Sequence, residues 1–172
     1  MPPRHLAVVG PGEGADAAAV ADAREVGRLA ALRGWIVLTG GRDAGVMAAA
    51  VAGASDASGL TVGLLPGATR DGAAPGLTVA LPTGLGEARN AVLVSAAEAV
   101  VACGLSPGTA SELALALRAR RPTVLVRPSP AAAAFFRSLA AGSLSIAADA
   151  AEALAWVERE LGDARPAAAP DA

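Results

Sequence analysis

Arg89 and Glu112 are the residues of this sequence whose types and positions point most directly to chemistry. Arg89 lies in the first turn of a helix expected over residues 87–97, where the positive end of the helix dipole disfavours a cation. A bound anion would account for an arginine at this position. The alternative is a surface ion pair with Glu87 or Glu98, which would add little to stability. The first interpretation is favoured, and it predicts that Arg89 contacts an anionic ligand.

Glu112 belongs to the segment 104–112 (GLSPGTASE), which also contains the start of a helix. Ser106 and Pro107 are typical of an N-cap and a first helical residue, and Thr109 with Glu112 matches a capping box. Both patterns have a purely structural explanation. Side chains on a helix lean toward its N-terminus, however, so Glu112 could direct its carboxylate into a crevice beside Gly108. The hydroxyl of Thr109 would then lie beside the free amides of the first turn.

Four glycine-containing loops, at residues 10–14, 39–45, 83–90 and 104–112, each precede an expected helix. Glycine lets the backbone approach a ligand closely, and helix N-termini offer free N–H groups to anions. One such loop is more often only a turn, but four together predict a binding site. The loop at 10–14 does not match G-x-G-x-x-G, so a dinucleotide fingerprint is weak. The predicted ligand-binding residues are Gly10, Gly12, Gly40, Gly41, Gly45, Arg89, Asn90, Ser106, Gly108, Thr109 and Glu112.

Alternating strands and helices must position these loops. Strands are expected over 5–9, 35–38, 60–65, 77–81, 99–103 and 123–126, and helices over 16–32, 44–54, 87–97, 109–120 and 150–161. This alternation predicts an α/β, Rossmann-like three-layer sandwich with a mainly parallel sheet of six or seven strands. All four loops would then lie at the carboxyl edge of the sheet. We expect one domain over 1–162, a mobile loop over 68–76 and a disordered tail over 163–172.

Composition excludes several classes of function. The fourteen basic residues are all arginine, so no lysine can form a Schiff base or serve a P-loop. A net charge of −2 without a basic stripe argues against nucleic-acid binding. The lone Cys103, the absence of a long apolar run and the absence of metal-ligand spacing predict a cytoplasmic protein without membrane segment or metal. Because aromatic residues are scarce, a ligand base would pack on aliphatic side chains or on Trp35.

Four motifs resemble the superfamily once labelled "possible lysine decarboxylase". They are 39–47 (TGGRDAGVM), 62–67 (VGLLPG), 83–90 (TGLGEARN) and 108–112 (GTASE). The superfamily includes the lonely-guy phosphoribohydrolases and the molybdenum cofactor carrier proteins, and is related to Rossmann-like DNA-processing proteins. The form of segment 83–90 is most similar to the carrier-like branch. The resemblance implies a Rossmann-like sheet and a homodimer or homotetramer. It also implies that Arg89 and Glu112 match catalytic residues of the hydrolases, and that Gly108 and Thr109 match their phosphate site.

The sequence departs from the hydrolase pattern at two places. Residues 104–109 read GLSPGT instead of Pro-Gly-Gly-x-Gly-Thr, so Leu105 would adopt a left-handed conformation only at a cost and Pro107 lacks an amide for phosphate. These changes would weaken phosphate binding or shift it to the hydroxyls of Ser106 and Thr109. Asn90 also replaces a lysine that the hydrolases usually carry. Both departures favour binding over catalysis.

Three functions follow from these observations. The leading hypothesis is a binding protein for a phosphorylated nucleotide-like or pterin ligand, with molybdenum cofactor as one candidate and no other cofactor required. The second is a phosphoribohydrolase that cleaves the N-glycosidic bond of nucleoside 5′-monophosphates, with Arg89 and Glu112 as catalytic residues. The third is an interaction module in which the pocket has degraded.

Overall fold

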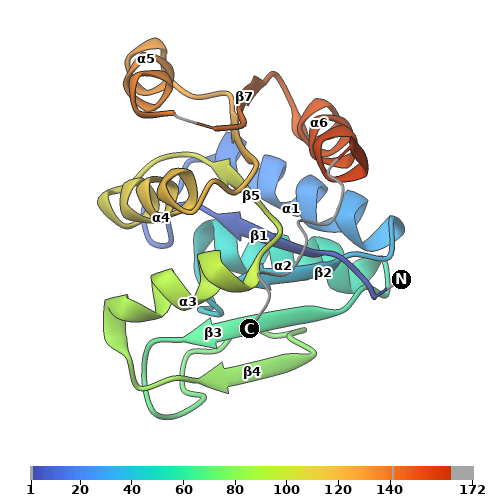
Figure 1. Ribbon diagram of the computed structural model, residues 1–172. Helices are drawn as coiled ribbons and strands as arrows, with labels where there is room; N and C mark the ends of the chain where they lie inside the picture. The colour runs from blue at the N-terminus through green and yellow to red at the C-terminus, as the bar shows by residue number, and fades with distance from the viewer. Residues whose placement is uncertain (1, 141, 164–172) are drawn as a thin grey trace, which may run out of the picture.

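Parallel strands form one seven-stranded sheet in the part of the chain that the computed structural model describes, residues 2–140 and 142–163. The strands are His5–Val9 (β1), Ile36–Thr39 (β2), Thr61–Leu65 (β3), Val79–Pro82 (β4), Ala99–Cys103 (β5), Thr123–Val126 (β6) and Leu144–Ala147 (β7). Their order across the sheet is β4-β3-β2-β1-β5-β6-β7. The chain therefore builds outward from β1 to β4 and then returns to place β5 on the other side of β1 (Figure 1). The predicted Rossmann-like α/β class is confirmed.

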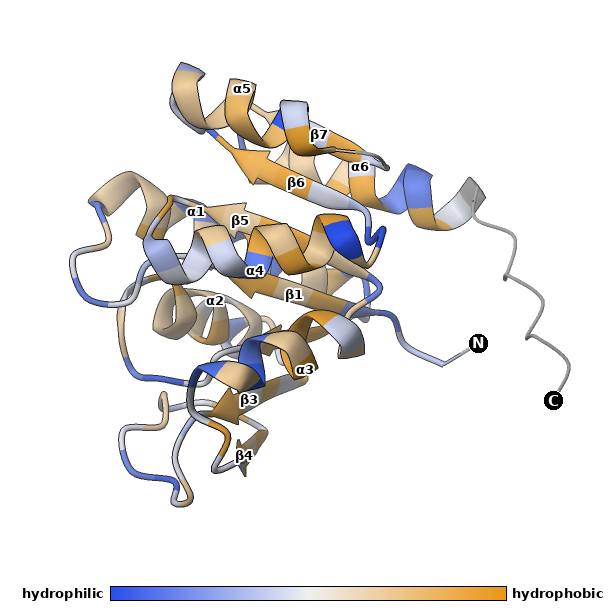
Figure 2. Ribbon diagram, turned by 60° about the vertical axis from the view of Figure 1, so that its left-hand side comes forward, coloured by the Kyte–Doolittle hydropathy of each residue, from blue (hydrophilic) through white to orange (hydrophobic). Residues whose placement is uncertain are grey.

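Helices cover both faces of the sheet and complete the three layers (Figure 1). One face carries α1 (Ala17–Leu32), α2 (Gly45–Asp56) and α6 (Ala150–Asp163). The other carries α3 (Arg89–Ala96), α4 (Pro107–Arg118) and α5 (Pro130–Leu139). Within β1, Leu6 and Val8 pack on the first layer while Ala7 and Val9 pack on the second. Because side chains alternate across a strand, a sheet covered on both faces requires continuous apolar strands, and Figure 2 shows them in orange.

Two glycines let α1 and α2 approach each other closely. A Cβ atom at Gly27 of α1 would lie 2.1 Å from the carbonyl oxygen of Ala50, and one at Gly53 of α2 would lie 1.9 Å from that of Arg24. Any side chain at either position would therefore meet the backbone of the facing helix. The loop before α1 and the loop before α2 both contribute residues to the functional edge of the sheet. The separation of the two helices therefore affects how close these two loops lie to each other.

Element boundaries differ from the predictions by a few residues. The helix expected over 87–97 begins with a 3₁₀ turn, Gly86–Ala88, and the helix expected from Thr109 begins at Pro107. The apolar segment 144–147, to which no element was assigned, is a strand because it pairs with β6. Asp163, expected as the first residue of a disordered tail, is the last residue of α6, and residues 164–172 of that tail lie outside the described residues.

The segment 68–76 is irregular, as expected, and is tied to the loop after β2. The N–H group of Asp43 donates to the carbonyl of Gly72 at 2.8 Å, and the N–H of Ala74 donates to the carbonyl of Gly41 at 2.8 Å. Ala74 itself is buried. These contacts place the segment against residues 41–43, and its predicted mobility stays a prediction.

Candidate functional site

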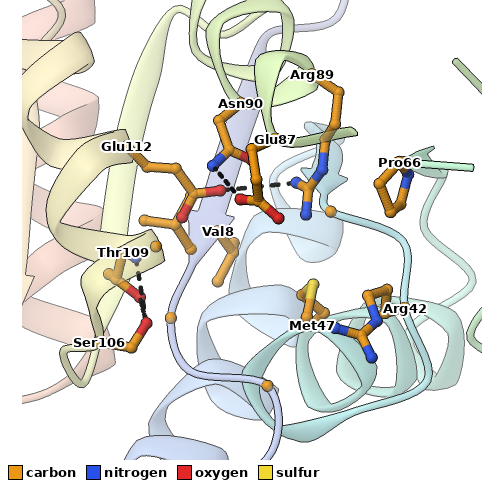
Figure 3. Close-up of a pocket in the computed structure, with 15 residues that line it drawn as sticks. Val8, Arg42, Met47, Pro66, Glu87, Arg89, Asn90, Ser106, Thr109 and Glu112 are labelled. Atoms are coloured by element: carbon orange, nitrogen blue, oxygen red, sulfur yellow. Dashed lines mark hydrogen bonds and ion pairs between the residues drawn. The ribbon is translucent and has the colours of Figure 1, made fainter. Parts of the chain in front are cut away.

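A cavity of about 170 Å³ opens at the carboxyl edge of the sheet, where the strand order reverses between β1 and β5. In open parallel sheets this reversal separates the loops on either side and leaves a crevice for ligands. Most of its walls come from the loops predicted to converge there. The lining residues are Val8, Val9, Gly10, Gly12, Gly40, Arg42, Met47, Pro66, Glu87, Arg89, Asn90, Ser106, Gly108, Thr109 and Glu112 (Figure 3).

Arg89 is buried in the wall of this cavity, and Gly40 makes room for it. The residue is 7% exposed, although it is the first residue of α3. A Cβ atom at Gly40 would lie 2.4 Å from Nη1 and 2.5 Å from Nη2 of the guanidinium, so the group lies directly over the glycine backbone. The glycine at 40 is therefore needed for the position of the arginine rather than for a turn.

The partner of Arg89 is Glu112, not either of the surface acids considered from sequence. Nη1 of Arg89 lies 3.7 Å from Oε1 of Glu112, and each side chain is 9% exposed (Figure 3). This distance is too long for a hydrogen bond. Nε and Nη1 of Arg89 are buried without a hydrogen-bond partner among the described residues. Glu98 instead accepts a hydrogen bond from the N–H of His5 at 2.8 Å. The pair is thus a buried charge pair with unused hydrogen-bonding capacity, which is costly unless a ligand completes it.

Burial raises the pKa of Glu112 to about 7. The nearby Arg89 cation lowers this pKa and Glu87 raises it, but the loss of water around the carboxylate is the largest effect. Burial likewise lowers the pKa of the Arg89 guanidinium, against the influence of the carboxylates of Glu112 and Glu87. Arginine remains charged at neutral pH in proteins. The site therefore holds a permanent cation next to a carboxyl group that gains or loses its proton near neutrality.

Replacing Glu112 with glutamine should change how stability depends on pH. The folded pKa of about 7 lies above the ordinary value of 4.5, so the folded protein holds a proton that the unfolded chain releases. This contribution to stability is complete below about pH 4.5 and is lost as the pH rises through about 7. Relative to Glu112→Gln, the unfolding free energy of the wild type should fall by about 3 kcal/mol across this range. Urea unfolding at several pH values measures it, and a pH-independent difference would contradict the assignment.

Asn90 and Glu87 extend the polar wall toward the opening. Nδ2 of Asn90 donates to Oε2 of Glu87 at 3.5 Å, a weak contact, and Oδ1 of Asn90 is buried without a partner among the described residues. Asn90 is 4% exposed, whereas Glu87 is exposed. Glu87 was considered only as an ion-pair partner for Arg89. It lines the cavity as well, so the opening carries a second carboxylate.

The start of α4 forms the opposite wall. Ser106 is the N-cap, with its Oγ accepting from the N–H of Thr109 at 3.2 Å and lying 2.9 Å from Oγ1 of Thr109. The alternative capping box, with Thr109 as the N-cap, is therefore not formed. Pro107 occupies the first helical position, where its missing N–H costs nothing. Pro107 has no N–H and the N–H of Thr109 is used by Ser106, so the N–H of Gly108 is the amide that these three residues leave for a ligand, and an added Cβ at Gly108 would find its nearest neighbour, Oγ of Ser106, at 3.8 Å.

The predicted glycines divide into two groups. Gly10, Gly12, Gly40 and Gly108 line the cavity. Gly41 and Gly45 do not. Gly41 has a φ of +76° and packs against the backbone of Gly63, and Gly45 has a φ of +47° and packs against the carbonyls of the 10–14 loop. Both are therefore required by backbone conformation and close packing.

Sequence reasoning missed several cavity residues and misjudged two others. Arg42, Met47 and Pro66 lie in motifs quoted for the family, so their position after strands β2 and β3 was an available signal. Trp35, expected as a surface for a ligand base, lies buried at the opposite end of β2, whereas the apolar side chain of Met47 lines the cavity. The expected strain at Leu105 is absent, because the turn takes its positive φ of +77° at Gly104.

Membrane-spanning helices and metal-binding clusters are both absent from residues 2–140 and 142–163. No helix there combines the length and apolar character needed to cross a membrane. No group of three or more His, Cys, Asp or Glu side chains in that part of the chain could hold a metal ion.

Sheet order and cavity position define an α/β protein of the Rossmann-like class with a ligand-type crevice at the switch point. The chain belongs to the SLOG cluster4 family, whose model matches residues 3–154. The predicted superfamily is thereby confirmed. An uncharacterised protein of Archaeoglobus fulgidus is 33% identical over 124 residues, which cover 72% of this chain and 80% of that protein.

Solved structures of related proteins share the whole fold. The molybdenum cofactor binding protein from Rippkaea orientalis is 37% identical, with a TM-score of 0.91 over 94% of this chain and 99% of that one. The molybdenum cofactor carrier protein from Chlamydomonas reinhardtii is 42% identical, with a TM-score of 0.88 over 94% and 99%. DNA processing protein A from Helicobacter pylori, at 17% identity and a TM-score of 0.68 over 95% and 82%, shares the fold alone.

Proposed function

We propose that the chain binds a phosphorylated nucleotide-like or pterin ligand, with molybdenum cofactor as the first candidate, in the cavity between β1 and β5. The observation that carries this proposal is the buried Arg89–Glu112 pair in a cavity at the switch point, where Nε and Nη1 of Arg89 have no hydrogen-bond partner among the described residues. Similarity to a molybdenum cofactor binding protein and a carrier protein over nearly the whole chain supports the choice of candidate. A homodimer or homotetramer, a cytoplasmic location and one domain over 1–162 are parts of the same proposal.

The residues present suit a ligand with an anionic end and a polar ring. Gly10, Gly12 and Gly108 let a phosphate approach the backbone closely, and Gly108 adds its N–H at the N-terminus of α4. Arg89 supplies a fixed positive charge, and Glu112 can accept hydrogen bonds from hydroxyl or ring N–H groups when ionised. Met47 offers an apolar surface to a ring.

Native mass spectrometry of freshly purified protein, followed by denaturation and identification of any released molecule, tests this function. A released pterin or nucleotide supports the proposal and names the ligand class. If the protein is empty, thermal shifts with molybdenum cofactor and with nucleoside monophosphates follow. Absence of both a released molecule and a thermal shift would overturn the proposal.

Hydrolysis of nucleoside 5′-monophosphates is a second candidate, favoured by one observation. Arg89 and Glu112, which match catalytic residues of the phosphoribohydrolases, line the same cavity and lie 3.7 Å apart. An ionised Glu112 would stabilise the positive ribose of the transition state and orient water, while Arg89 would hold phosphate or the leaving base. Release of free base from adenosine monophosphate or its N6-substituted forms tests this reaction. The open cavity gives no support to a degraded pocket.

A Gly40→Ala variant should lower ligand affinity without removing any ligand-binding group. The new Cβ would lie 2.4–2.5 Å from the terminal nitrogens of Arg89, so the guanidinium must move away. We expect affinity for a nucleoside monophosphate to fall about tenfold and stability to fall by about 1 kcal/mol, a modest overpacking cost. Isothermal titration measures the affinity. Gly67→Ala is the control, because its Cβ would find its nearest neighbour at 4.0 Å. Equal affinities for both variants would contradict the role assigned to Gly40.

A further inference from the structure

A second cavity, of about 180 Å³, opens at the same edge of the sheet, beyond the turn Gly104–Ser106. It is similar in volume to the first cavity, which is about 170 Å³. Its floor is the carboxyl ends of β5 and β6, and one wall is the first turn of α5. The lining residues are Asp16, Ala102, Gly104, Leu105, Leu125, Val126, Arg127, Pro128, Ser129 and Ala132. The turn Gly104–Ser106 contributes to both cavities, because Ser106 lines the first and Gly104 and Leu105 line the second.

Arg127, in the wall of this second cavity, has an unusual backbone conformation. Within the described residues, three non-glycine residues have a positive φ: Ser58, Arg120 and Arg127. Ser58 and Arg120 follow helix ends, where the left-handed conformation is common. Arg127, with a φ of 46°, directly follows β6 at the ligand-binding edge of the sheet. Backbone conformations of this kind persist only where surrounding contacts enforce them, and they are concentrated at functional sites.

Asp22 holds Arg127 in that conformation. Nε of Arg127 donates to Oδ2 of Asp22 at 2.9 Å, and Nη2 pairs with Oδ1. The side chain of Asp22 is 9% exposed and comes from α1, far away in sequence. The two-pronged contact therefore joins α1 to the loop between β6 and α5 and fixes one wall of the second cavity.

Charge and surface composition indicate what this cavity would accept. Asp16 is the carboxylate in the lining, and the guanidinium of Arg127 already pairs with Asp22 of α1, so the cavity does not favour a phosphate. Leu105, Leu125 and Ala132 supply apolar walls. Asp16 and Ser129 are the N-caps of α1 and α5, and the second carboxylate oxygen of Asp16 can accept a hydrogen bond from a ligand. An uncharged, flat ring that carries N–H donors fits this combination.

We propose that the second cavity binds the far nucleoside of a dinucleotide-type ligand whose phosphorylated near half lies in the first cavity. The two cavities flank the reversal between β1 and β5, which is the arrangement by which parallel sheets hold the two halves of a dinucleotide. The pyrophosphate would cross the Gly104–Ser106 turn beside the first turn of α4. The G-x-G-x-x-G fingerprint, which the 10–14 loop lacks, binds a pyrophosphate at the loop after β1. The pyrophosphate proposed here lies instead at the turn that follows β5. The inference rests on the proposed function, because the first cavity must take the phosphorylated half.

Titration of the whole protein with matched ligands tests this inference. The probes are guanosine monophosphate and two guanosines joined 5′ to 5′ by a pyrophosphate, with the adenosine pair as a second series. We expect the dinucleotide to bind at least about tenfold more tightly than the monophosphate, since a second linked contact adds to affinity. Ala132→Met, which fills the second cavity, should reduce dinucleotide affinity to that of the monophosphate. Ala134→Met, at an exposed position of the same helix, should change neither affinity.

Each outcome decides the inference. Equal affinities for the two probes, or a loss of both affinities in Ala132→Met, would overturn it. If Ala132→Met fails to fold, Leu105→Ser removes an exposed apolar wall instead and should weaken the dinucleotide alone. If monophosphate binds and dinucleotide gains nothing, the inference fails while the proposed function stands. If neither probe binds in either series, both fail for nucleotides.

Discussion

Replacement of Arg89 with methionine should lower affinity for a nucleoside monophosphate by on the order of 100-fold. The guanidinium is the buried positive charge of the cavity, and two of its nitrogen atoms have no hydrogen-bond partner among the described residues. Truncating one member of a buried charged contact typically costs about 2–5 kcal/mol, because the remaining charge is left unpaired. Methionine keeps most of the volume and removes the charge. Titration calorimetry with the monophosphate measures the loss, and circular dichroism checks that the variant folds.

Arg42→Met provides the matched control for this prediction. Arg42 lines the same cavity, but its side chain is 51% exposed and lies 3.4 Å from Glu13 at the surface. Exposed ion pairs contribute about 0–1 kcal/mol, so affinity should fall by less than about fivefold. A larger loss for Arg42→Met than for Arg89→Met would show that the anion binds at the rim. The proposed position of the phosphorylated ligand would then be wrong.

A Gly27→Ala variant should lower stability strongly although it adds only a methyl group. The added Cβ would lie 2.1 Å from the carbonyl oxygen of Ala50, so α1 and α2 must separate. Overpacking of this kind costs about 3 kcal/mol, and the better helix propensity of alanine returns about 1 kcal/mol. We therefore expect a net loss of about 2 kcal/mol and a fall in the thermal midpoint of about 4–8 °C. Calorimetry and urea unfolding measure both quantities.

Gly162→Ala is the control that separates the effect of the α1–α2 contact from the effect of helix propensity. Gly162 lies in α6, and a Cβ there would find nothing within 4 Å. The substitution should leave stability unchanged or raise it by up to about 1 kcal/mol. If Gly27→Ala behaves in the same way, the close approach of α1 and α2 is not needed for the fold.

The sequence was sufficient to predict six of the seven strands, the layers and the edge of the sheet that carries the site. Predominantly apolar runs such as 99–103 and 123–126 form strands at the predicted residues, because strands buried on both faces are rich in apolar residues. Ser106 and Pro107 are the N-cap and first residue of α4, as their residue types indicate, whereas the expected bounds of 109–120 start the helix two residues too late. Short-range chemistry of this kind can be read from sequence because each pattern has few structural solutions.

Long-range partners could not be predicted in the same way. Glu87 and Glu98 are near Arg89 in sequence, yet Glu112 is its partner because α3 and α4 lie side by side at the sheet edge. Gly40 looked like part of a ligand loop, but it is the backbone surface under the guanidinium of Arg89. Asp22 and Arg127 gave no sequence signal at all, since they are 105 residues apart.

The sequence by itself determined which loops lie at the crevice, because in a parallel sheet the loop after each strand lies at the same edge. Only the tertiary structure decided which side chains are buried there and in what charge state. Burial depends on atoms contributed by distant segments, and it is burial that raises the pKa of Glu112 to about 7 and leaves Arg89 with unused hydrogen-bonding atoms. The second cavity, behind the Gly104–Ser106 turn, likewise exists only once α1, β6 and α5 have packed together.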